Sequence, residues 1–387
     1  MKPIFLSAAF IFMGVAASAQ GVEQGRKNAP QFRPAWPTQT RAPAQDSGIE
    51  FKVDVLAEGL ETPWGVEVLP EGGYLVTERT GALRMVRDGT VSEPITGVPD
   101  VLAEGQGGLL DVALAPDFAR SRVIYLSYAK PMGGGRSSTA AARAVLSPDA
   151  TTLSDVSDIF VQQPPSRNAM HFGSRVVPQD GYVFITTGEH FTEQDRQLAQ
   201  DVGTTYGKVV RVLPRGGAAA GNPFDNEVWT LGHRNVQGAD IHPTTGALWT
   251  LEHGPRGGDE LNVLEKGANY GWPVVSYGVN YSGSPVGSGD ARASDFTEPR
   301  YYWDPVIAPG DFAFYNGKMF PGWQGDIIAS SLTPGGLVRL RLKGDRAVAE
   351  ERFFPGEIRA RDVEIDRDGA ILLLDNSDGR LLRLTRQ

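Results

Sequence analysis

Short apolar runs, each introduced by a turn, recur along the whole chain. In six places a turn that contains proline or aspartate, and in five of them also glycine, precedes a run rich in aliphatic and aromatic residues. The six copies are 69–79 (LPEGGYLVTER), 114–128 (LAPDFARSRVIYLSY), 177–189 (VPQDGYVFITTGE), 242–254 (HPTTGALWTLEHG), 320–331 (FPGWQGDIIASS) and 366–377 (DRDGAILLLDNS). Runs of this length, bounded by Gly, Pro, Asp and Asn, are typical of β-strands. Their recurrence indicates one structural unit repeated six times.

Several copies are followed by a second apolar run across a turn that contains Gly, Asp or Asn, as in a β-hairpin. These second runs are residues 81–86, 206–213, 335–342 and 379–386. Helical periodicity is confined to short patches such as 193–199. The pattern therefore predicts an all-β, six-bladed β-propeller, in which each repeat is a small sheet packed on its neighbours. Two β-sandwiches would also contain many strands, but they would not explain the recurring phrase.

The N-terminal residues have the features of a secretory signal. Lys2 is followed by an apolar stretch over residues 4–15, and Ala17 and Ala19 form an A-x-A cleavage pattern. We therefore predict a signal peptide at residues 1–19. The mature protein is expected to be soluble, in the periplasm or outside the cell, because no later stretch is apolar enough to span a bilayer.

The composition changes twice along the chain. Residues 20–49 are rich in Pro, Gln, Arg and Ala, which indicates a flexible leader. Residues 50–387 are then predicted to form a single propeller domain. The chain contains no cysteine, so a disulfide scaffold is excluded, and core packing or bound metal must hold the exported domain together. The net charge of −9 argues against nucleic acid or an anionic membrane as the main partner.

Polar residues interleaved with glycines follow several of the predicted strands. In a propeller, loops that follow the inner strands converge at one end of the axis, where a site is expected. The loops carry Gln106, His171, Glu189, His190, His233, Arg234, Asn235, Arg359 and Arg361. Each of these residues could instead have a purely structural role. A single histidine is more often a satisfied core residue, and the two C-terminal arginines could pair with Asp362 or Glu364.

The segment 252–262, EHGPRGGDELN, places glycine and proline between a histidine and several acids. The spacing of His233, His242 and His253 does not fit a transition-metal site. The carbonyl oxygens of Gly254 and Pro255, together with nearby carboxylates, suit calcium, which binds several oxygens in a loosely defined geometry. Glu260 could instead cap a turn.

In this order, several longer motifs resemble one enzyme family. They are LETPWGVEVLPEGGYLVTER, GQGGLLDVALAPDF, HFGSR, LGHRNVQGADIHPTTGALWTLEHGPRGGDELNVLEKGANYGWP and VIAPGDFAFYNGKMFPGWQGDII. From about Val53 to the C-terminus, the chain resembles the soluble quinoprotein glucose and sorbosone dehydrogenases, most closely the PQQ-dependent aldose sugar dehydrogenases. The resemblance implies a six-bladed propeller that binds pyrroloquinoline quinone (PQQ) and Ca²⁺ and oxidises an aldose at C1.

The resemblance also implies roles for the catalytic residues. His171 matches the base that takes the proton of the anomeric hydroxyl while hydride passes to the quinone. Glu189 lies where a carboxylate orients that histidine, although the family more usually has Asp there; a neighbouring carboxylate is expected to raise the imidazole pKa. Gln106 matches a glutamine near the base and the sugar. Arg234 matches a residue that favours the reduced, more anionic cofactor.

The resemblance also implies which residues contact the cofactor and the metal ions. Asn235 lies with Arg234 beside the quinone carbonyls, and Arg359 and Arg361 match the pair that faces the cofactor carboxylates. The resemblance further places Gly254 and Pro255 as ligands of the catalytic Ca²⁺, and Glu260 and Tyr270 as ligands of a second, structural Ca²⁺. Two loops depart from some relatives. Thr333 and Pro334 stand where some relatives have a lysine that meets the cofactor, and Asn280 stands where certain members have an aspartate.

Two other classes remain open on the sequence. Six-bladed calcium propellers include lactone and ester hydrolases, in which the metal activates water or a carbonyl group. A hydrolase has no need for the set Arg234, Asn235, Arg359 and Arg361, which suits a planar, multiply anionic ligand. A binding propeller without cofactor would need neither the base nor the calcium carbonyls. The preferred sugar, the electron acceptor and the oligomeric state are left open.

Overall fold

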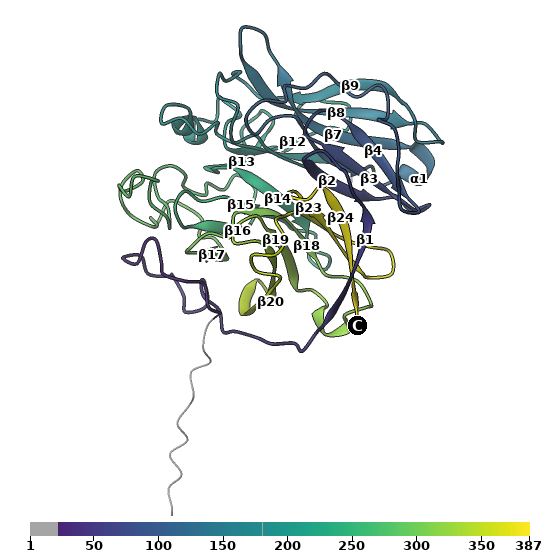
Figure 1. The fold of residues 1–387 in the computed structure, drawn as a ribbon. Coiled ribbons are helices and arrows are strands. Elements are labelled where there is room, and N and C mark those ends of the chain that lie inside the picture. The colour runs from purple at the N-terminus through teal and green to yellow at the C-terminus, as the bar shows by residue number, and fades with distance from the viewer. Residues whose placement is uncertain (1–21, 180) are drawn as a thin grey trace, which may run out of the picture.

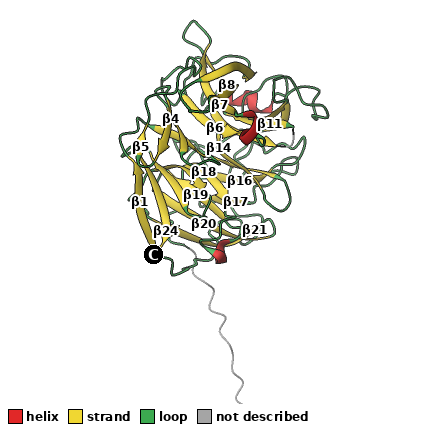
Figure 2. Ribbon diagram, turned by 90° about the vertical axis from the view of Figure 1, so that its right-hand side faces the viewer, coloured by secondary structure: helices red, strands yellow, loops and turns green. Residues whose placement is uncertain are grey.

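The computed structural model describes residues 22–179 and 181–387, and its strands form six four-stranded antiparallel sheets. Figure 2 shows how strands dominate the molecule and helices are reduced to short segments. The first strands of the six sheets contact one another in a closed ring, in the order β2, β6, β10, β14, β18, β22 and back to β2. This confirms the predicted all-β, six-bladed propeller. The predicted signal peptide, residues 1–19, lies outside the described residues.

Each blade contains four strands, and the first strand of each lies in the inner ring. Blade 1 contains β2 (Pro63–Val68), β3 (Tyr74–Glu78), β4 (Leu83–Arg87) and β5 (Thr90–Val91). Blade 2 contains β6 (Leu109–Leu114), β7 (Val123–Pro131), β8 (Ser137–Leu146) and β9 (Leu153–Val161). Blade 3 contains β10 (Gly173–Gln179), β11 (Tyr182–Thr187), β12 (Lys208–Val212) and β13 (Val228–Leu231).

The other three blades follow the same plan. Blade 4 contains β14 (Val236–Ile241), β15 (Leu248–Glu252), β16 (Asp259–Val263) and β17 (Tyr301–Trp303). Blade 5 contains β18 (Pro309–Phe314), β19 (Ile327–Ser331), β20 (Gly336–Lys343) and β21 (Arg346–Phe353). Blade 6 contains β22 (Ala360–Ile365), β23 (Ile371–Asp375), β24 (Arg380–Arg386) and β1 (Phe51–Ala57). The helical segments are α1 (Phe118–Ser121), η1 (Asp195–Gln200) and η2 (Pro321–Trp323).

Strand β1 closes the ring by completing the last blade. It pairs with β24 in antiparallel register, from Phe51 opposite Arg386 to Ala57 opposite Leu381. The N-terminal and C-terminal strands of the domain therefore share one sheet, so that separation of either end would open the propeller.

The six copies of the repeated phrase correspond to the second strands of the blades, β3, β7, β11, β15, β19 and β23. These strands read as continuous apolar runs because both of their faces pack against neighbouring blades; every residue of β15, β19 and β23 is buried. The expectation that the site loops follow the innermost strands is wrong. Because the strands are antiparallel, the loops that leave the second strands meet the loops that enter the first strands at the same end of the axis.

Charged side chains join the innermost strands inside the ring. Arg175 of β10 is buried and contacts Asp111 of β6 at 2.9 Å, Asp311 of β18 at 3.1 Å and Asp362 of β22 at 3.1 Å. Asp362 also accepts a 2.6 Å hydrogen bond from the Val66 amide of β2. Five blades are thus tied together by one buried guanidinium group and its carboxyl partners.

The segment that precedes β1 lies along blades 4 and 5, as the purple trace in Figure 1 shows. Its Ala29 amide donates to Asp304 at 2.9 Å, and its Ala42 amide donates to Tyr301 Oη at 3.0 Å. Glu350 of β21 donates its amide to the Pro43 carbonyl at 2.9 Å. The composition of residues 20–49 indicates a flexible leader, whereas residues 22–49 have these fixed partners, all of which lie more than 250 residues away in sequence.

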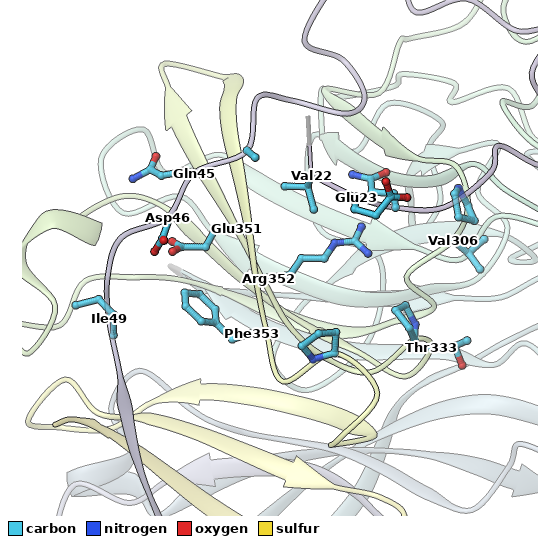
Figure 3. Close-up of a pocket in the computed structure, with 15 residues that line it drawn as sticks. Val22, Glu23, Gln45, Asp46, Ile49, Val306, Thr333, Glu351, Arg352 and Phe353 are labelled. Atoms are coloured by element: carbon cyan, nitrogen blue, oxygen red, sulfur yellow. The ribbon is translucent and has the colours of Figure 1, made fainter. Parts of the chain in front are cut away.

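A cavity of about 840 Å³ lies between this segment and blade 5 (Figure 3). Val22, Ile49, Val306, Arg352 and Phe353 are among its lining residues. Of the residues singled out from the sequence, Thr333 and Pro334 line it. In the described part of the chain, no helix has the length and apolar character needed to cross a membrane.

Candidate active site

Loops from blades 2, 3 and 4 bring the candidate catalytic residues together. His171 precedes β10, Glu189 follows β11, and Arg234 precedes β14. His171 Nδ1 lies 3.1 Å from Glu189 Oε1, and Arg234 Nε lies 3.9 Å from the same oxygen. Gln106, which precedes β6, accepts the His171 amide at 2.8 Å. These four residues, chosen from the sequence, therefore form one connected group.

The imidazole of His171 is held in one tautomer. A carboxylate only accepts hydrogen bonds, so the contact with Glu189 places the proton on Nδ1 and leaves the Nε2 lone pair free. Burial and the nearby Arg234 charge lower the pKa of His171, and together they outweigh the raising effect of Glu189. Glu189 thus raises the pKa of His171 as expected, but the net pKa is lowered because burial penalises the imidazolium and Arg234 adds a positive charge. The imidazole of His171 is therefore neutral at neutral pH.

Glu189 is suited to orient His171 while it remains ionised. Burial alone would raise its pKa, but the hydrogen bond with His171 and the charge of Arg234 hold the pKa below the ordinary value. Its second oxygen accepts the amide of Phe191. The longer side chain of Glu is thereby fixed at both oxygens.

The backbone around this pair is strained. His171, His190 and Phe191 have φ values of 48°, 60° and 73°, in the left-handed region that non-glycine residues rarely adopt. A Cβ at Gly188 would lie 1.8 Å from the His171 carbonyl oxygen, so only glycine fits there. Strain of this kind persists where the surrounding structure enforces it and often marks a functional site.

Arg234 and Asn235 lie between the base and the segment 253–255. Arg234 donates through one terminal nitrogen to the carbonyls of His253 at 3.1 Å and Gly254 at 2.7 Å. Asn235 Oδ1 accepts the Gly173 amide at 3.0 Å. Arg234 is buried, and its Nε has no hydrogen-bond partner in the part of the chain that the structure describes.

Arg359 and Arg361 lie at the same end of the axis, at the start of β22. Arg359 donates to the Leu332 carbonyl at 2.9 Å, and Arg361 donates to Gln237 Oε1 at 2.8 Å. Within residues 22–179 and 181–387 neither arginine forms a salt bridge, so the alternative pairing with Asp362 or Glu364 is not observed. A bulge between Ala360 and Asp362 interrupts the simple strand alternation that the sequence suggested.

Arg79 is a third arginine of this group and was not identified from the sequence. It follows β3 and donates to the carbonyls of Gly105 and Gly107. Burial, together with the positive charges of Arg359 and Arg79, lowers the pKa of Arg361 to about 9. The residue after the second strand of a blade belongs to the site end, and Arg79 holds that place in the first copy of the repeat. The position of Arg79 directly after the repeated apolar run was the sequence signal that could have identified it.

Gln237 and His253 connect the two arginine regions. The side-chain oxygen of Gln237 lies 2.8 Å from the donating nitrogen of Arg361 and 2.9 Å from His253 Nε2. Burial and two nearby arginines hold the pKa of His253 well below its usual range. His253 is therefore a neutral hydrogen-bonding residue, and Gln237 orients both of its partners.

The segment from Gly254 to Gly258 folds tightly at the top of blade 4. A Cβ at Gly254 would lie 2.2 Å from the Gly258 carbonyl oxygen. The Gly254 amide donates to Asp259 Oδ1 at 2.8 Å, while Asp259 Oδ2 accepts the amides of Ile307 and Ala308 at 2.8 and 2.7 Å. Asp259, another residue missed from the sequence, thus holds the main chain at Gly254 against the loop that enters blade 5.

The carbonyl oxygens of Gly254 and Pro255 fit a hard cation only if main-chain carbonyls supply most of its ligands. In the described residues, no group of three or more His, Cys, Asp or Glu side chains is arranged to hold a metal. The carbonyls of Gly254 and Pro255 could therefore provide a partial shell that an anionic ligand completes.

Glu260 and Tyr270 line a small enclosed cavity next to the Gly254 loop, together with Glu252 and Ser276. Burial and the neighbouring Glu252 raise the pKa of Glu260 well above its usual value. The Tyr270 hydroxyl donates to the Val263 carbonyl at 2.6 Å, so the hydroxyl is already occupied. Because the carboxyl groups of Glu252 and Glu260 lie close together, they favour a bound cation or a shared proton between them.

A second pocket, of about 240 Å³, opens beside the candidate base. Its lining includes Glu189, Arg234 and Pro255, and, from other loops, Phe191, Arg196 and Tyr281. Asn280 also lines this pocket and accepts a 2.9 Å hydrogen bond from Arg196. The pocket therefore joins Glu189, which contacts the candidate base His171, with Arg234 and Pro255 in one space.

Comparison with known proteins gives consistent matches. Residues 60–383 match the family model described as "Glucose / Sorbosone dehydrogenase". The aldose sugar dehydrogenase YliI of Escherichia coli (strain K12) is 41% identical over 345 residues, which cover 86% of this chain and 92% of that protein.

Solved structures agree with this similarity. The apo form of the soluble aldose sugar dehydrogenase from Escherichia coli has a TM-score of 0.83 and 39% identity, covering 87% of this chain and 100% of that chain. The PQQ-bound form of aldose sugar dehydrogenase from Streptomyces coelicolor has a TM-score of 0.71 and 28% identity, covering 89% of this chain and 100% of that chain.

Proposed function

This chain belongs to the glucose and sorbosone dehydrogenase family, and we propose that it is a quinoprotein that oxidises aldose sugars at C1 to lactones with PQQ and Ca²⁺. The PQQ-bound relative supports the choice of cofactor. The small-molecule pocket beside His171 supports a sugar-sized substrate.

The observation that carries the proposal is the cluster of Arg79, Arg359 and Arg361. In the described residues these guanidinium groups have no carboxylate partner, and the pKa of Arg361 is lowered by burial and by the other two. Uncompensated positive charge in a partly buried site is costly unless a ligand supplies the counter-charge. PQQ is a planar tricarboxylate, and planar guanidinium groups suit it.

His171 is proposed as the base of the reaction. With Nδ1 protonated towards Glu189, its Nε2 can take the proton from the anomeric hydroxyl. A bound PQQ would supply the hydride acceptor for C1, and a bound Ca²⁺ would supply Lewis-acid polarisation. The sugar thereby loses one hydride and one proton and becomes a lactone. Arg234 and Asn235 provide fixed donors beside this space.

The metal positions are also proposals. Gly254 and Pro255 are assigned to the catalytic Ca²⁺ because Asp259 holds the main chain at Gly254. Glu260 with Tyr270 is assigned to a second Ca²⁺ because Glu252 and Glu260 lie opposite each other on neighbouring strands. The Tyr270 ligand would be its main-chain carbonyl, since its hydroxyl is occupied.

Titration of the purified protein with PQQ and Ca²⁺, followed by dye-linked oxidation of a panel of aldoses, tests the proposal. Activity is expected only when both are present. A calcium-dependent lactonase would instead hydrolyse lactones without any response to PQQ. That outcome would reject the quinoprotein assignment.

We further propose that the propeller domain, residues 50–387, is exported after removal of residues 1–19. The signal sequence supports this location. N-terminal sequencing of the protein from a periplasmic fraction tests it, and an N-terminus that begins at Met1 would contradict it.

A further inference from the structure

His190 lies directly behind the candidate base and is fully buried. It follows Glu189 in the chain, and no step of the proposed reaction uses it. A buried imidazole destabilises the fold unless its polar atoms are hydrogen-bonded. The partners of His190 therefore indicate what the residue does.

Most partners of His190 belong to the loop that carries His171. The His190 amide donates to the His171 carbonyl at 3.4 Å. Its ring Nδ1 lies 2.9 Å from the Met170 carbonyl and 3.1 Å from the Asn168 carbonyl. The side chain of Asn168 also donates to the His190 carbonyl at 2.8 Å. Three of the four carbonyl groups of residues 168–171 therefore face this one residue.

The other ring nitrogen of His190 is held from blade 2. His190 Nε2 lies 2.6 Å from the side-chain oxygen of Gln162, which follows β9. The orientation of the Gln162 amide is fixed, because its nitrogen donates to the Gly188 carbonyl at 2.8 Å and to the Thr205 carbonyl at 3.1 Å. Reversal of the amide would place its oxygen against both carbonyl oxygens. His190 Nε2 therefore faces an acceptor.

Both ring nitrogens of His190 thus face oxygen acceptors, and only the imidazolium form can donate from both. Burial lowers the pKa of His190 to about 4, against the raising effects of Glu189 and of Asp195 on η1. Tyr206, whose ring packs on His190, stays neutral because burial raises its own pKa to about 12. A neutral imidazole would leave a nitrogen lone pair 2.6 Å or 2.9 Å from an oxygen, so the observed contacts indicate the protonated ring in spite of burial.

On the basis of the proposed function, we propose that His190 is a positioning residue for the base. Protonated on both ring nitrogens, it joins Gln162 to the loop of residues 168–171. His171 is thereby kept within hydrogen-bond distance of Glu189. The left-handed backbone at His171 and His190, with φ values of 48° and 60°, persists because these contacts enforce it.

Nitrogen NMR of the histidine rings tests this geometry on the purified protein without added PQQ. At neutral pH, both His190 nitrogens should be protonated, and His171 should be protonated on Nδ1 only. His190→Phe keeps a ring against Phe172 and Tyr206 but removes both donors, so His171 should lose its single tautomer. A wild-type His190 ring with one unprotonated nitrogen overturns the proposal, even if His190→Phe does not fold. An unaltered His171 ring in a folded His190→Phe overturns it as well.

The kinetic test uses the PQQ- and Ca²⁺-loaded protein with an aldose as substrate. His190→Phe should lower kcat about 100-fold, the loss that a misplacement of about 1 Å causes, while KM for the sugar stays close to the wild-type value. His190→Gln should recover little, because an amide donates from one end only. His242→Phe is the matched control and should retain wild-type kcat, since His242 follows β14 at the opposite end from the base.

The two measurements separate the positioning role from the proposed reaction. If the NMR pattern holds but no aldose is oxidised, His190 still positions His171 and the oxidation is rejected. If an aldose is oxidised and His190→Phe retains wild-type kcat, the oxidation stands and the positioning role is overturned.

Discussion

A terminal nitrogen of Arg234 lies 2.7 Å from the carbonyl oxygen of Gly254. The same nitrogen lies 3.1 Å from the His253 carbonyl. A guanidinium group therefore already contacts the Gly254 carbonyl, one of the two main-chain oxygens that we assign to Ca²⁺. Two positive charges at this distance repel each other strongly in a buried site, unless an anionic ligand lies between them or beside them.

We therefore predict that PQQ and Ca²⁺ bind with positive coupling. In calorimetric titrations, PQQ should tighten Ca²⁺ binding at this site about tenfold, and by linkage Ca²⁺ should tighten PQQ binding equally. Arg234→Gln should improve Ca²⁺ binding in the absence of PQQ, because it removes the competing charge. Arg120→Gln, at a side chain that is 86% exposed, is the control. Equal Ca²⁺ affinity with and without PQQ would contradict the coupling.

Replacement of the proposed base should separate binding from turnover. His171→Ala is expected to retain PQQ binding and to lose roughly 2 to 4 orders of magnitude in kcat, as for removal of a positioned base. His242→Ala is a suitable control because His242 follows β14 at the opposite end from Arg234. Wild-type turnover in His171→Ala would assign His171 to a structural role.

The pH profile should report the lowered pKa of His171. The base is active when neutral, so kcat/KM should stay constant down to a pH below the ordinary histidine pKa and then fall. Glu189→Gln removes the charge that raises this pKa, while the amide oxygen can still accept from Nδ1. The acid limb should therefore move to lower pH, with a lower plateau because the base is weaker. An acid limb displaced to higher pH would be inconsistent with this electrostatic assignment.

Arg361→Ala should weaken PQQ without destabilising the apoprotein. Loss of a hydrogen bond to a charged group costs about 1.5–3 kcal/mol, or roughly 10-fold to 100-fold in PQQ affinity. Burial and the neighbouring arginines lower the pKa of Arg361 to about 9, so its charge is unfavourable in the apoprotein. The melting temperature should therefore stay the same or rise. A lower melting temperature with unchanged PQQ affinity would falsify the cofactor role.

The number of blades and their β-sheet character could be predicted from local sequence pattern alone. The reason is that the second strand of each blade is buried on both faces, so its sequence is an apolar run between turns. The connected group around His171, Glu189 and Arg234 was also predictable from motifs. Arg79 and Asp259 were missed because their roles arise between blades: Asp259 of blade 4 accepts amides of Ile307 and Ala308. The partners of residues 22–49 are equally distant in sequence, and no local periodicity encodes them.

Asp240 allows a test of the charges inside the ring. It lies on β14, and its carboxylate accepts the amides of Ile241 at 2.7 Å and of Phe314 on β18 at 2.9 Å. Burial raises its pKa to about 6. A group whose folded pKa exceeds its unfolded pKa stabilises the fold at low pH, and this contribution is lost as the pH rises through the folded pKa.

We therefore predict that Asp240→Asn is less stable than the wild type at pH 5, because it loses an acceptor, and that this deficit shrinks by roughly 1–3 kcal/mol at pH 8. Urea unfolding of the apoprotein at the two pH values measures the change, with the free energy of unfolding compared at each. Asp54→Asn, at the 39% exposed side chain of Asp54 on β1, should show no comparable change between pH 5 and pH 8. A deficit that grows with pH would mean that Asp240 is stabilised as a carboxylate by its two amide donors, and that burial does not control its ionisation.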